Sequence, residues 1–260
     1  MTNSLDRRGF IRHASAYAAA GVGCLTLGGL GPVLKAAGRT AAHGALNVPS
    51  RPFNMLAFGD SIMWGQGLSD NTKFATLVKD WVSANLAGRA VTFQNLAHSG
   101  AVIQADPAHD GPTGWEGEVP SPNPSIQHQL YSARDAMLSS SANPAEIDLV
   151  LLNGGANDVG ITHILNPFTS SGGVEELTRD AVGDRMAYLL PIAVGLFPNA
   201  KFIVPGYFPI ITNDSSTGEI TALLTILFGP LGLLVTPGVK GQLIANCSAF
   251  YLQSGAGLRA

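Results

Sequence analysis

The order of apolar runs and helical stretches constrains the fold of this chain more than any other feature. Four short apolar runs are typical of buried parallel strands, and helical stretches separate them in the sequence. The stretch Asn71–Leu86 carries apolar residues at helical spacing, and Ser125–Leu138 and Val174–Phe197 follow the next two strands. This alternation predicts an α/β fold with a doubly wound parallel sheet and helices on both faces. The predicted strands are Phe53–Phe58, Ala90–Leu96, Ile147–Asn153 and Lys201–Tyr207.

The amino-terminal part of the chain differs from the rest in composition. Arg7-Arg8 precedes the uncharged stretch Ala14–Leu34, as in a twin-arginine export signal. We therefore expect residues 1–45 to be a leader that the twin-arginine export machinery of a bacterial cell recognises, so that residues 46–260 reach the periplasm or the medium. Two alternatives to a cleaved leader stay open. The apolar stretch could form a membrane anchor, or a lipid could be attached to Cys24.

The expected mature domain is acidic. Residues 1–45 hold five of the 15 basic and one of the 18 acidic residues, which leaves a net charge of about −7 on residues 46–260. No basic patch interleaved with aromatic residues is present, so nucleic acid is not an expected partner. Cys247 is then the one remaining cysteine, and we expect a buried structural thiol.

Polar, glycine-bearing segments follow the first three predicted strands. They are Gly59-Asp60-Ser61, Asn95–Gly100 and Gly155–Asp158. Because the carboxyl ends of parallel strands meet at one edge of a sheet, we expect the three segments to lie close together. Each alone has an ordinary structural interpretation, as a helix cap, a turn glycine or a loop pair.

Taken together and in this order, the three segments resemble blocks I, II and III of the SGNH (GDSL-type) serine ester hydrolases, over about residues 50–260. The resemblance implies a flavodoxin-like three-layer α/β/α sandwich and ester hydrolysis without a cofactor or metal. It implies Ser61 as nucleophile, and an oxyanion hole formed by the backbone N–H groups of Ser61 and Gly100 and the side-chain amide of Asn157. Asp158 is expected to be structural. No Gly-x-Ser-x-Gly motif surrounds Ser61, which argues against the α/β-hydrolase elbow.

These residue types suit acyl transfer. A serine hydroxyl is a weak nucleophile at neutral pH and needs an adjacent base. Glycine at position 100 lets the backbone approach an ester closely, because it has no Cβ. The amide of Asn157 can donate two hydrogen bonds to a transient oxyanion without carrying charge.

One block of the family pattern is missing. In the family, Asp and His come from a late Asp-x-x-His block, whereas residues 241–260 contain neither residue type and no histidine follows His163. Two explanations stay open. Either the sequence is a C-terminally incomplete form of a longer protein, lacking a fifth strand as well, or the base comes from elsewhere in the chain.

His109 is the candidate for a base from elsewhere. Asp106-Pro107-Ala108-His109 has Asp-x-x-His spacing and opens the segment Asp106–Pro124, which we expect to be a surface loop on the same edge as Ser61. The other histidines have structural expectations: His98 and His163 orient loops or line the pocket, and His128 lies on a helix.

The expected function is hydrolysis of carboxylic esters of the lipid, acyl or acetyl type through an acyl-enzyme. The apolar segment Ile220–Val235 is either a buried helix or a mobile flap over the site, and as a flap it favours lipid or acyl esters over acetylated sugars. A peripheral membrane contact is a further expectation. The alternative is a non-catalytic protein that keeps this fold but lacks the base. A flavodoxin-like cofactor binder is disfavoured, because bulky Ile62-Met63-Trp64 stands where a phosphate-binding loop would be needed.

Overall fold

A computed structural model describes residues 51–86, 89–109, 111, 117–118, 120–229 and 235–257. The predicted leader, residues 1–45 with Cys24, lies outside the described residues, so the predictions on export and membrane anchoring stay predictions.

The described residues form a parallel sheet of four strands in the order β2-β1-β3-β4. The chain moves outward from β1 to β2 and then crosses back to β3, so the connections diverge between β1 and β3. In open α/β sheets, ligand sites form at such a switch point, beyond the carboxyl ends of the strands. The predicted doubly wound parallel sheet is confirmed. Its strands are β1 (Phe53–Phe58), β2 (Val91–Asn95), β3 (Ile147–Leu152) and β4 (Lys201–Ile203).

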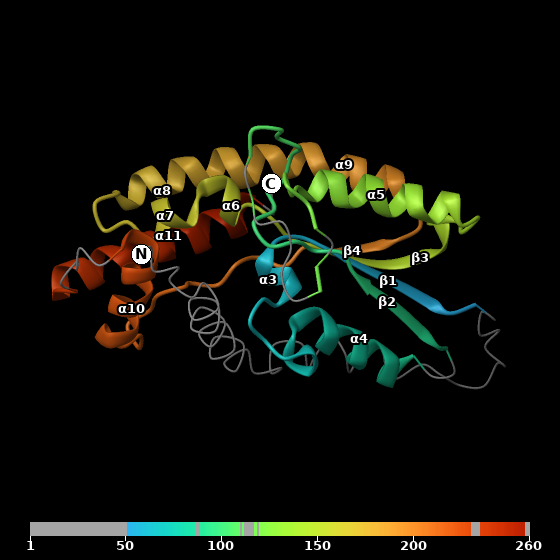
Figure 1. The fold of residues 1–260 in the computed structure, drawn as a ribbon, viewed down its shortest axis with the longest axis horizontal. Helices are drawn as coiled ribbons and strands as arrows, with labels where there is room; N and C mark the ends of the chain where they lie inside the picture. Colours follow the sequence, from blue (N-terminus) through green and yellow to red (C-terminus); the bar gives the residue numbers. More distant parts are fainter. Residues whose placement is uncertain are drawn as a thin grey trace, which may run out of the picture.

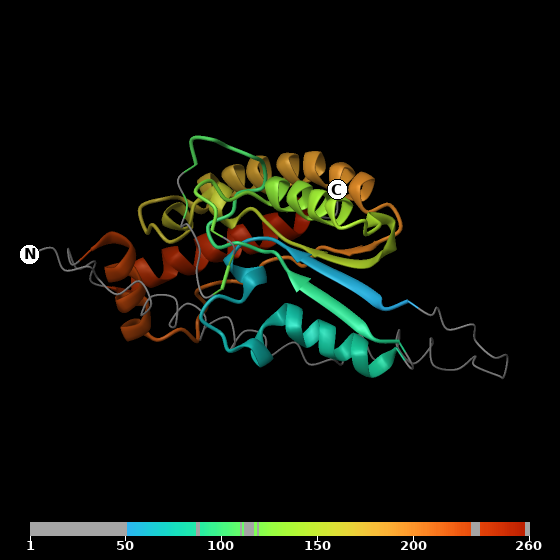
Figure 2. The same cartoon turned by 45° about the vertical axis from the view of Figure 1, so that its right-hand side comes forward.

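Helices cover both faces of the sheet, which gives the expected three layers (Figures 1 and 2). Helix α4 lies on one face, and α5 and α9 lie on the other, while α8 packs against α11 beyond the carboxyl ends of the strands. The helical elements are α3 (Ser61–Trp64), η2 (Asp70–Thr72), α4 (Phe74–Asn85), α5 (Ile126–Ser139), η3 (Pro144–Glu146), α6 (Ala156–Val159), α7 (Ile161–Ile164), α8 (Ser171–Thr178), η4 (Arg179–Asp184), α9 (Arg185–Leu196), α10 (Thr217–Phe228) and α11 (Pro237–Gly257).

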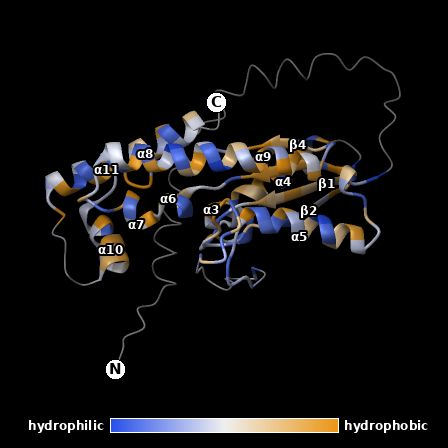
Figure 3. Ribbon diagram, turned by 90° about the horizontal axis from the view of Figure 1, so that it is seen from above, coloured by the Kyte–Doolittle hydropathy of each residue, from blue (hydrophilic) through white to orange (hydrophobic). Residues whose placement is uncertain are grey.

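Side chains that alternate along β1 build two hydrophobic clusters. Leu56 and Phe58 pack on the side of α5 and α9, and Met55 and Ala57 pack on the side of α4. This is the period of two that a strand imposes on its side chains. The strands in Figure 3 accordingly carry the colour of hydrophobic residues over much of their length. The sheet is therefore buried on both faces, as its apolar sequence predicted.

The fourth predicted strand is shorter than expected. It ends at Ile203 rather than Tyr207. Pro205 has no N–H to donate to a sheet ladder, so it favours an end to the strand. Tyr207 is nevertheless buried, and its side chain turns into the protein beside Phe250, with ring centroids 4.9 Å apart.

Two helical regions also differ in detail from the prediction. The stretch Val174–Phe197 is divided by the π-helical segment η4 between α8 and α9. Within Ile220–Val235, residues up to Phe228 belong to α10, whose Ile220, Leu223 and Leu224 are buried in the core. Residues 230–234 lie outside the described part of the chain.

The long helix α11 was not predicted, because its glycines interrupt the helical pattern of its sequence. Its buried face includes Cys247, and burial raises the pKa of this thiol to about 11. A buried thiol of this kind is unreactive, in line with its expected structural role. In the described part of the chain, no helix combines the length and hydrophobicity required to cross a membrane.

An ion-pair cluster joins β1 and β3 at the end of the sheet opposite Ser61. Asp148 accepts two hydrogen bonds from the guanidinium of Arg51, at 2.6 and 2.8 Å, and one from Asn54 N at 2.9 Å. The guanidinium of Arg89 lies 3.3 Å away. Partial burial opposes ionisation of Asp148, but these bonds and charges outweigh it, and the pKa of Asp148 lies below its usual range.

Asp148→Asn is expected to lower the free energy of unfolding by about 1 kcal/mol at pH 7, since Arg51 is partly exposed and solvent screens the pair. A lowered folded-state pKa stabilises the protein above the unfolded-state pKa of about 4, and this stabilisation disappears as pH falls through the folded-state value. Urea unfolding at several pH values should therefore show a difference that is constant above about pH 5 and shrinks below about pH 4. Asp135→Asn, which alters an exposed pair with Arg134, is the control with little effect. If the difference in unfolding free energy between Asp148→Asn and wild type did not change with pH, the ion pair of Asp148 with Arg51 would not be its cause.

Candidate active site

Ser61 is the first residue of the short helix α3, directly beyond the carboxyl end of β1. Asp60 caps this helix, because its side chain accepts a hydrogen bond from Ile62 N at 2.9 Å. The helix ends after one turn at Gly65, which adopts a left-handed conformation at φ 72°. Ser61 itself is partly exposed. A serine held on a tight turn at the switch point has the position required of a nucleophile.

The carboxylate of Asp60 is buried in a hydrogen-bond network. It has no exposed surface, and it accepts bonds from Asn153 Nδ2 at 3.2 Å and from the Tyr207 hydroxyl at 2.5 Å. Burial raises the pKa of Asp60, and the hydrogen bonds from Tyr207, Ile62 and Asn153 oppose that rise. Asp60 therefore holds the turn that carries Ser61.

Gln129 fixes the residue that precedes this cap. Its side-chain amide donates to Gly59 O and accepts from Gly59 N, both at 2.9 Å. The carbonyl of Gly59 also accepts a bond from His98 N at 3.0 Å, from the segment after β2. Helix α5 and the segment after β2 thus both hold the nucleophile turn.

Hydrogen bonds also join the segments that follow β2 and β3. Asn157 Nδ2 donates to Ala101 O at 2.9 Å, and the carboxylate of Asp158 accepts from Ile103 N at 3.0 and 3.2 Å. Gly100 adopts the positive φ of 77°, which glycine reaches without strain. The structure thus brings Ser61, Gly100 and Asn157 to one edge of the sheet, as the order of the motifs indicated.

Asp158 holds in place the loop of residues 96–103, which follows β2 and is named the Gly100 loop. Its side chain has no exposed surface, and Arg185 Nη1 lies 2.6 Å from its Oδ1. Burial raises the pKa of Asp158, and the hydrogen bond and charge of Arg185 oppose this. Both carboxylate oxygens contact the loop backbone, so the contacts of Asp158 are structural.

His109 lies beside the Gly100 loop. Its Nε2 is 2.8 Å from Gly100 O, an arrangement that requires a proton on Nε2. The carboxylate of Asp106 accepts instead from Ala108 N at 2.9 Å, and Asp106 O accepts from His109 N at 3.0 Å. The Asp-x-x-His segment therefore forms a turn, and its histidine contacts the loop of the expected oxyanion hole.

His98 and Glu118 form a buried cluster behind the same loop. His98 is 4 % exposed, and its Nδ1 lies 2.8 Å from Ser99 O and 3.8 Å from Glu118 Oε2. Ser99 donates to Glu118 Oε1 from its backbone at 3.1 Å and from its hydroxyl at 2.5 Å. Glu118 belongs to the segment Asp106–Pro124, and its contacts with Ser99 hold this described residue of the segment beside the residues that follow β2. This cluster fixes the residues immediately before Gly100.

The other two histidines of the described residues lie at the surface. His128, on α5, and His163, on α7, are both exposed. Among the described residues, no three His, Cys, Asp or Glu side chains form a group that could hold a metal ion.

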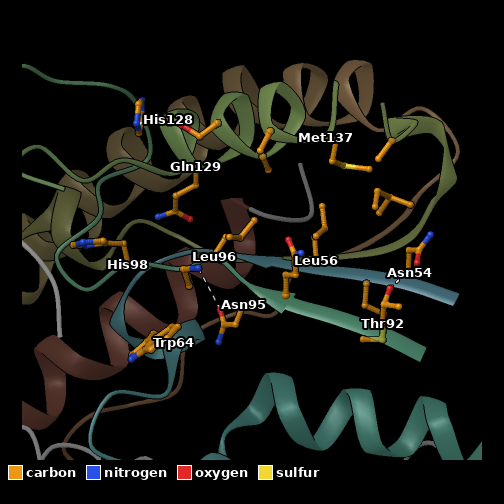
Figure 4. A pocket seen from close by; sticks show the side chains of 18 of the residues that line it. Asn54, Leu56, Trp64, Thr92, Asn95, Leu96, His98, His128, Gln129 and Met137 are labelled. Carbon is orange, nitrogen blue, oxygen red and sulfur yellow. Dashed lines mark hydrogen bonds between the residues drawn. The ribbon is translucent and has the colours of Figure 1, made fainter. Parts of the chain in front are cut away.

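A cavity of about 540 Å³ lies next to these residues, between α5 and strands β1 and β2 (Figure 4). Trp64 and His98 lie at one end of it, and Gln129 and Met137 point into it from α5. Its walls mix apolar side chains with uncharged polar ones such as Thr92. Ser61, Gly100 and Asn157 do not line this cavity, so it lies beside the nucleophile turn.

Sequence reasoning missed four residues that hold the site, namely Gln129, Asn153, Tyr207 and Glu118. One of them left a signal, since Gln129 is a polar residue on the apolar face of its helix, between Ile126 and Ala133. The others come from loops or strand ends, where local pattern does not indicate the contacts of a side chain.

Several solved structures resemble this chain in fold. Phospholipase A1 from Streptomyces albidoflavus NA297 is 16% identical, with 80% of this chain and 76% of that chain covered and a TM-score of 0.43. The extracellular lipase from Streptomyces rimosus is 13% identical, with the same coverage and a TM-score of 0.46. A putative arylesterase from Agrobacterium tumefaciens str. C58 is 17% identical, with 80% and 98% covered and a TM-score of 0.33. Because the sequence identities and TM-scores are this low, the similarity to these structures carries no argument about the activity of the chain.

No curated protein is significantly similar to the chain in sequence. A family model described as GDSL-like Lipase/Acylhydrolase, however, matches residues 55–215, a range that includes Ser61, Gly100, Asn157 and Tyr207. Because this match spans more than half of the 260 residues, the chain belongs to the family of GDSL-like lipases and acylhydrolases, which act on esters.

Proposed function

We propose that this protein hydrolyses carboxylic esters with Ser61 as the nucleophile. The observation that carries the proposal is the buried network of Asp60, Asn153 and Gln129, which holds Ser61 at the switch point of the sheet. The hydrogen bonds of Asn157 and Asp158 to the segment after Gly100 support it, because they join the segments that follow β2 and β3, to which the proposed oxyanion donors belong.

In the proposed reaction, Ser61 Oγ attacks the carbonyl carbon of the ester while a base removes the hydroxyl proton. The electron pair of the C=O π bond moves to the oxygen, which accepts hydrogen bonds from Ser61 N, Gly100 N and Asn157 Nδ2. When the tetrahedral intermediate collapses, the alkoxide leaves with the proton held by the base, and Ser61 remains acylated. Water then attacks the acyl group by the same sequence and releases the acid and the free serine.

The proposed substrates are small-molecule or lipid esters with an acyl or acetyl group. The family match supports this class of substrate, because GDSL-like lipases and acylhydrolases act on esters. Among the described residues, His109 is the proposed candidate for the base, and His98 is the other histidine beside the Gly100 loop, so both are varied in the test.

A second candidate function is that of a non-catalytic protein that keeps the SGNH fold. The observation in its favour is that the rings of His109 and His98 both contact backbone carbonyls, those of Gly100 and Ser99. Among the hydrogen bonds of the described residues, none joins either ring to the hydroxyl of Ser61.

A fluorophosphonate probe tests the proposal. We expect stoichiometric labelling of the 260-residue chain, located at Ser61 by peptide mass spectrometry, and complete loss of labelling in Ser61→Ala. Ser83→Ala, which removes an exposed serine of α4, is the matched control and should label like wild type. His109→Ala and His98→Ala then assign the base, since loss of it should slow labelling by about 10²–10⁴-fold. Absence of labelling in a folded sample would show that these 260 residues hold no working base, which would overturn the proposal for this chain and favour the non-catalytic function.

A further inference from the structure

Tyr207 connects parts of the site that lie far apart in the sequence. It stands four residues beyond β4, is 7 % exposed, and donates a 2.5 Å hydrogen bond to Asp60 Oδ2 across 147 residues of sequence. Its oxygen also accepts a 3.1 Å hydrogen bond from Ala156 N. One hydroxyl therefore bridges the segments that follow β1 and β3.

The bond to Asp60 acts on the orientation of Ser61. The other oxygen of this carboxylate, Oδ1, accepts from Ile62 N at 2.9 Å and from Asn153 Nδ2 at 3.2 Å. Ser61 is the residue between Asp60 and Ile62. A rotation of the Asp60 carboxylate would therefore displace the backbone N–H and the hydroxyl of Ser61 together.

The bond from Ala156 acts on Asn157. Helix α6 begins at Ala156, and its cap residue is Gly155, which has no side chain to satisfy the first N–H groups. The Tyr207 hydroxyl supplies the missing acceptor from outside the helix. Because Asn157 follows Ala156 directly, the same oxygen positions the second turn of the site.

We infer that Tyr207 is a positioning residue of the active site, and that its hydroxyl sets the distance between the turn of Ser61 and the turn of Asn157. The inference rests on the proposed function of Ser61 and Asn157. The hydroxyl does not touch the reacting atoms. It acts by holding the nucleophile and one oxyanion donor in register, and small displacements of such groups are costly in rate.

The Asp60–Tyr207 bond should also leave a signature in the pH dependence of stability. Burial raises the pKa of Asp60, and the Tyr207 hydroxyl, which opposes that rise, stabilises the ionised carboxylate. Burial and the charges of Asp60 and Asp158 raise the pKa of Tyr207 well above its usual value, so it stays a donor at neutral pH. From α11, the uncharged ring of Phe250 packs against Tyr207.

The direction of this pH dependence follows from the difference between the pKa of Asp60 in the folded and in the unfolded state. A folded-state pKa above the unfolded value of about 4 favours folding at low pH, and stability is lost as pH rises toward the folded-state pKa. Tyr207→Phe raises the Asp60 pKa further. Its loss of stability relative to wild type should therefore grow as pH rises from the folded-state pKa of Asp60 in wild type toward the higher value in the variant, whereas loss of packing alone would not depend on pH.

Tyr207→Phe, compared with Tyr251→Phe, tests the inference. Tyr251 is 43% exposed on α11, so its variant should behave like wild type. With a p-nitrophenyl ester as substrate, Tyr207→Phe is expected to lower kcat by about 10–100-fold with KM within about twofold, because alignment and not substrate binding is lost.

The outcomes separate this inference from the proposed function. An unchanged kcat in Tyr207→Phe, with wild type labelled at Ser61, would overturn the positioning role and leave the proposed function intact. A stability loss independent of pH would equally count against the Asp60–Tyr207 link. If the wild-type chain is not labelled at Ser61, both the proposed function and the positioning role of Tyr207 are overturned, since no reaction would remain for Tyr207 to serve.

Discussion

Asn157→Ala is expected to lower kcat for ester hydrolysis by about 10²–10³-fold, the usual effect of removing one oxyanion donor, if the proposed reaction is correct. The side-chain amide has two N–H bonds, and the bond to Ala101 O at 2.9 Å uses one of them and sets the orientation of the amide. The second N–H is then available to the oxygen of the tetrahedral intermediate. Since that oxygen carries full charge only after attack, KM should change little.

Steady-state kinetics with a soluble p-nitrophenyl ester measures this effect, beside a thermal melt of each variant. Asn85→Ala is the matched control, because Asn85 also donates through Nδ2 to a backbone carbonyl, that of Trp81, but is an exposed residue of α4 far from Asn157 in sequence. Its kcat should equal that of wild type. A kcat for Asn157→Ala within twofold of wild type would show that Asn157 serves only the loop it contacts.

Gly59→Ala is expected to lower the free energy of unfolding by about 3 kcal/mol or more, an overpacking effect at a fully buried site. A Cβ at position 59 would overlap Asn153 Oδ1 and lie 2.7 Å from Met63 Cβ. Asn153 cannot move away freely, because its side chain bonds to Asp60 N and to the Asp60 carboxylate. The added methyl group would therefore disturb the network that holds Ser61.

Urea unfolding followed by circular dichroism measures the loss. Gly195→Ala is the control, because Gly195 lies in α9 and a Cβ there would meet no atom within 4 Å. Alanine should stabilise that helix by about 0.5–1 kcal/mol relative to glycine. Equal stability of Gly59→Ala and wild type would mean that Asn153 can leave Asp60 without cost, which contradicts the buried network.

Much of the framework could be predicted from local pattern. The strand Phe53–Phe58 has the predicted bounds, and Ile147–Leu152 differs by one residue. Both are continuous apolar runs with polar or glycine residues at their ends, so burial on both faces defines them. The predicted length of the strand that begins at Lys201 was too great. Its apolar sequence continues past Pro205 toward the buried Tyr207, which is not part of the sheet.

The sequence alone determined which residues stand at the strand ends. Ser61, Gly100 and Asn157 follow three predicted strands in order, and parallel strands place their carboxyl ends at one edge whatever the details of packing. The roles of Ser61, Gly100, Asn157 and His109 in catalysis stay predictions that the experiments above test.

Only the tertiary structure decided what holds those residues. The bonds from Tyr207 to Asp60 and from Gln129 to Gly59 span 147 and 70 residues of sequence. Spacing within a segment indicates helices and strands because those contacts are local. A hydrogen bond between distant segments depends on how layers pack and on which polar atoms burial leaves in need of a partner, and no local pattern records this.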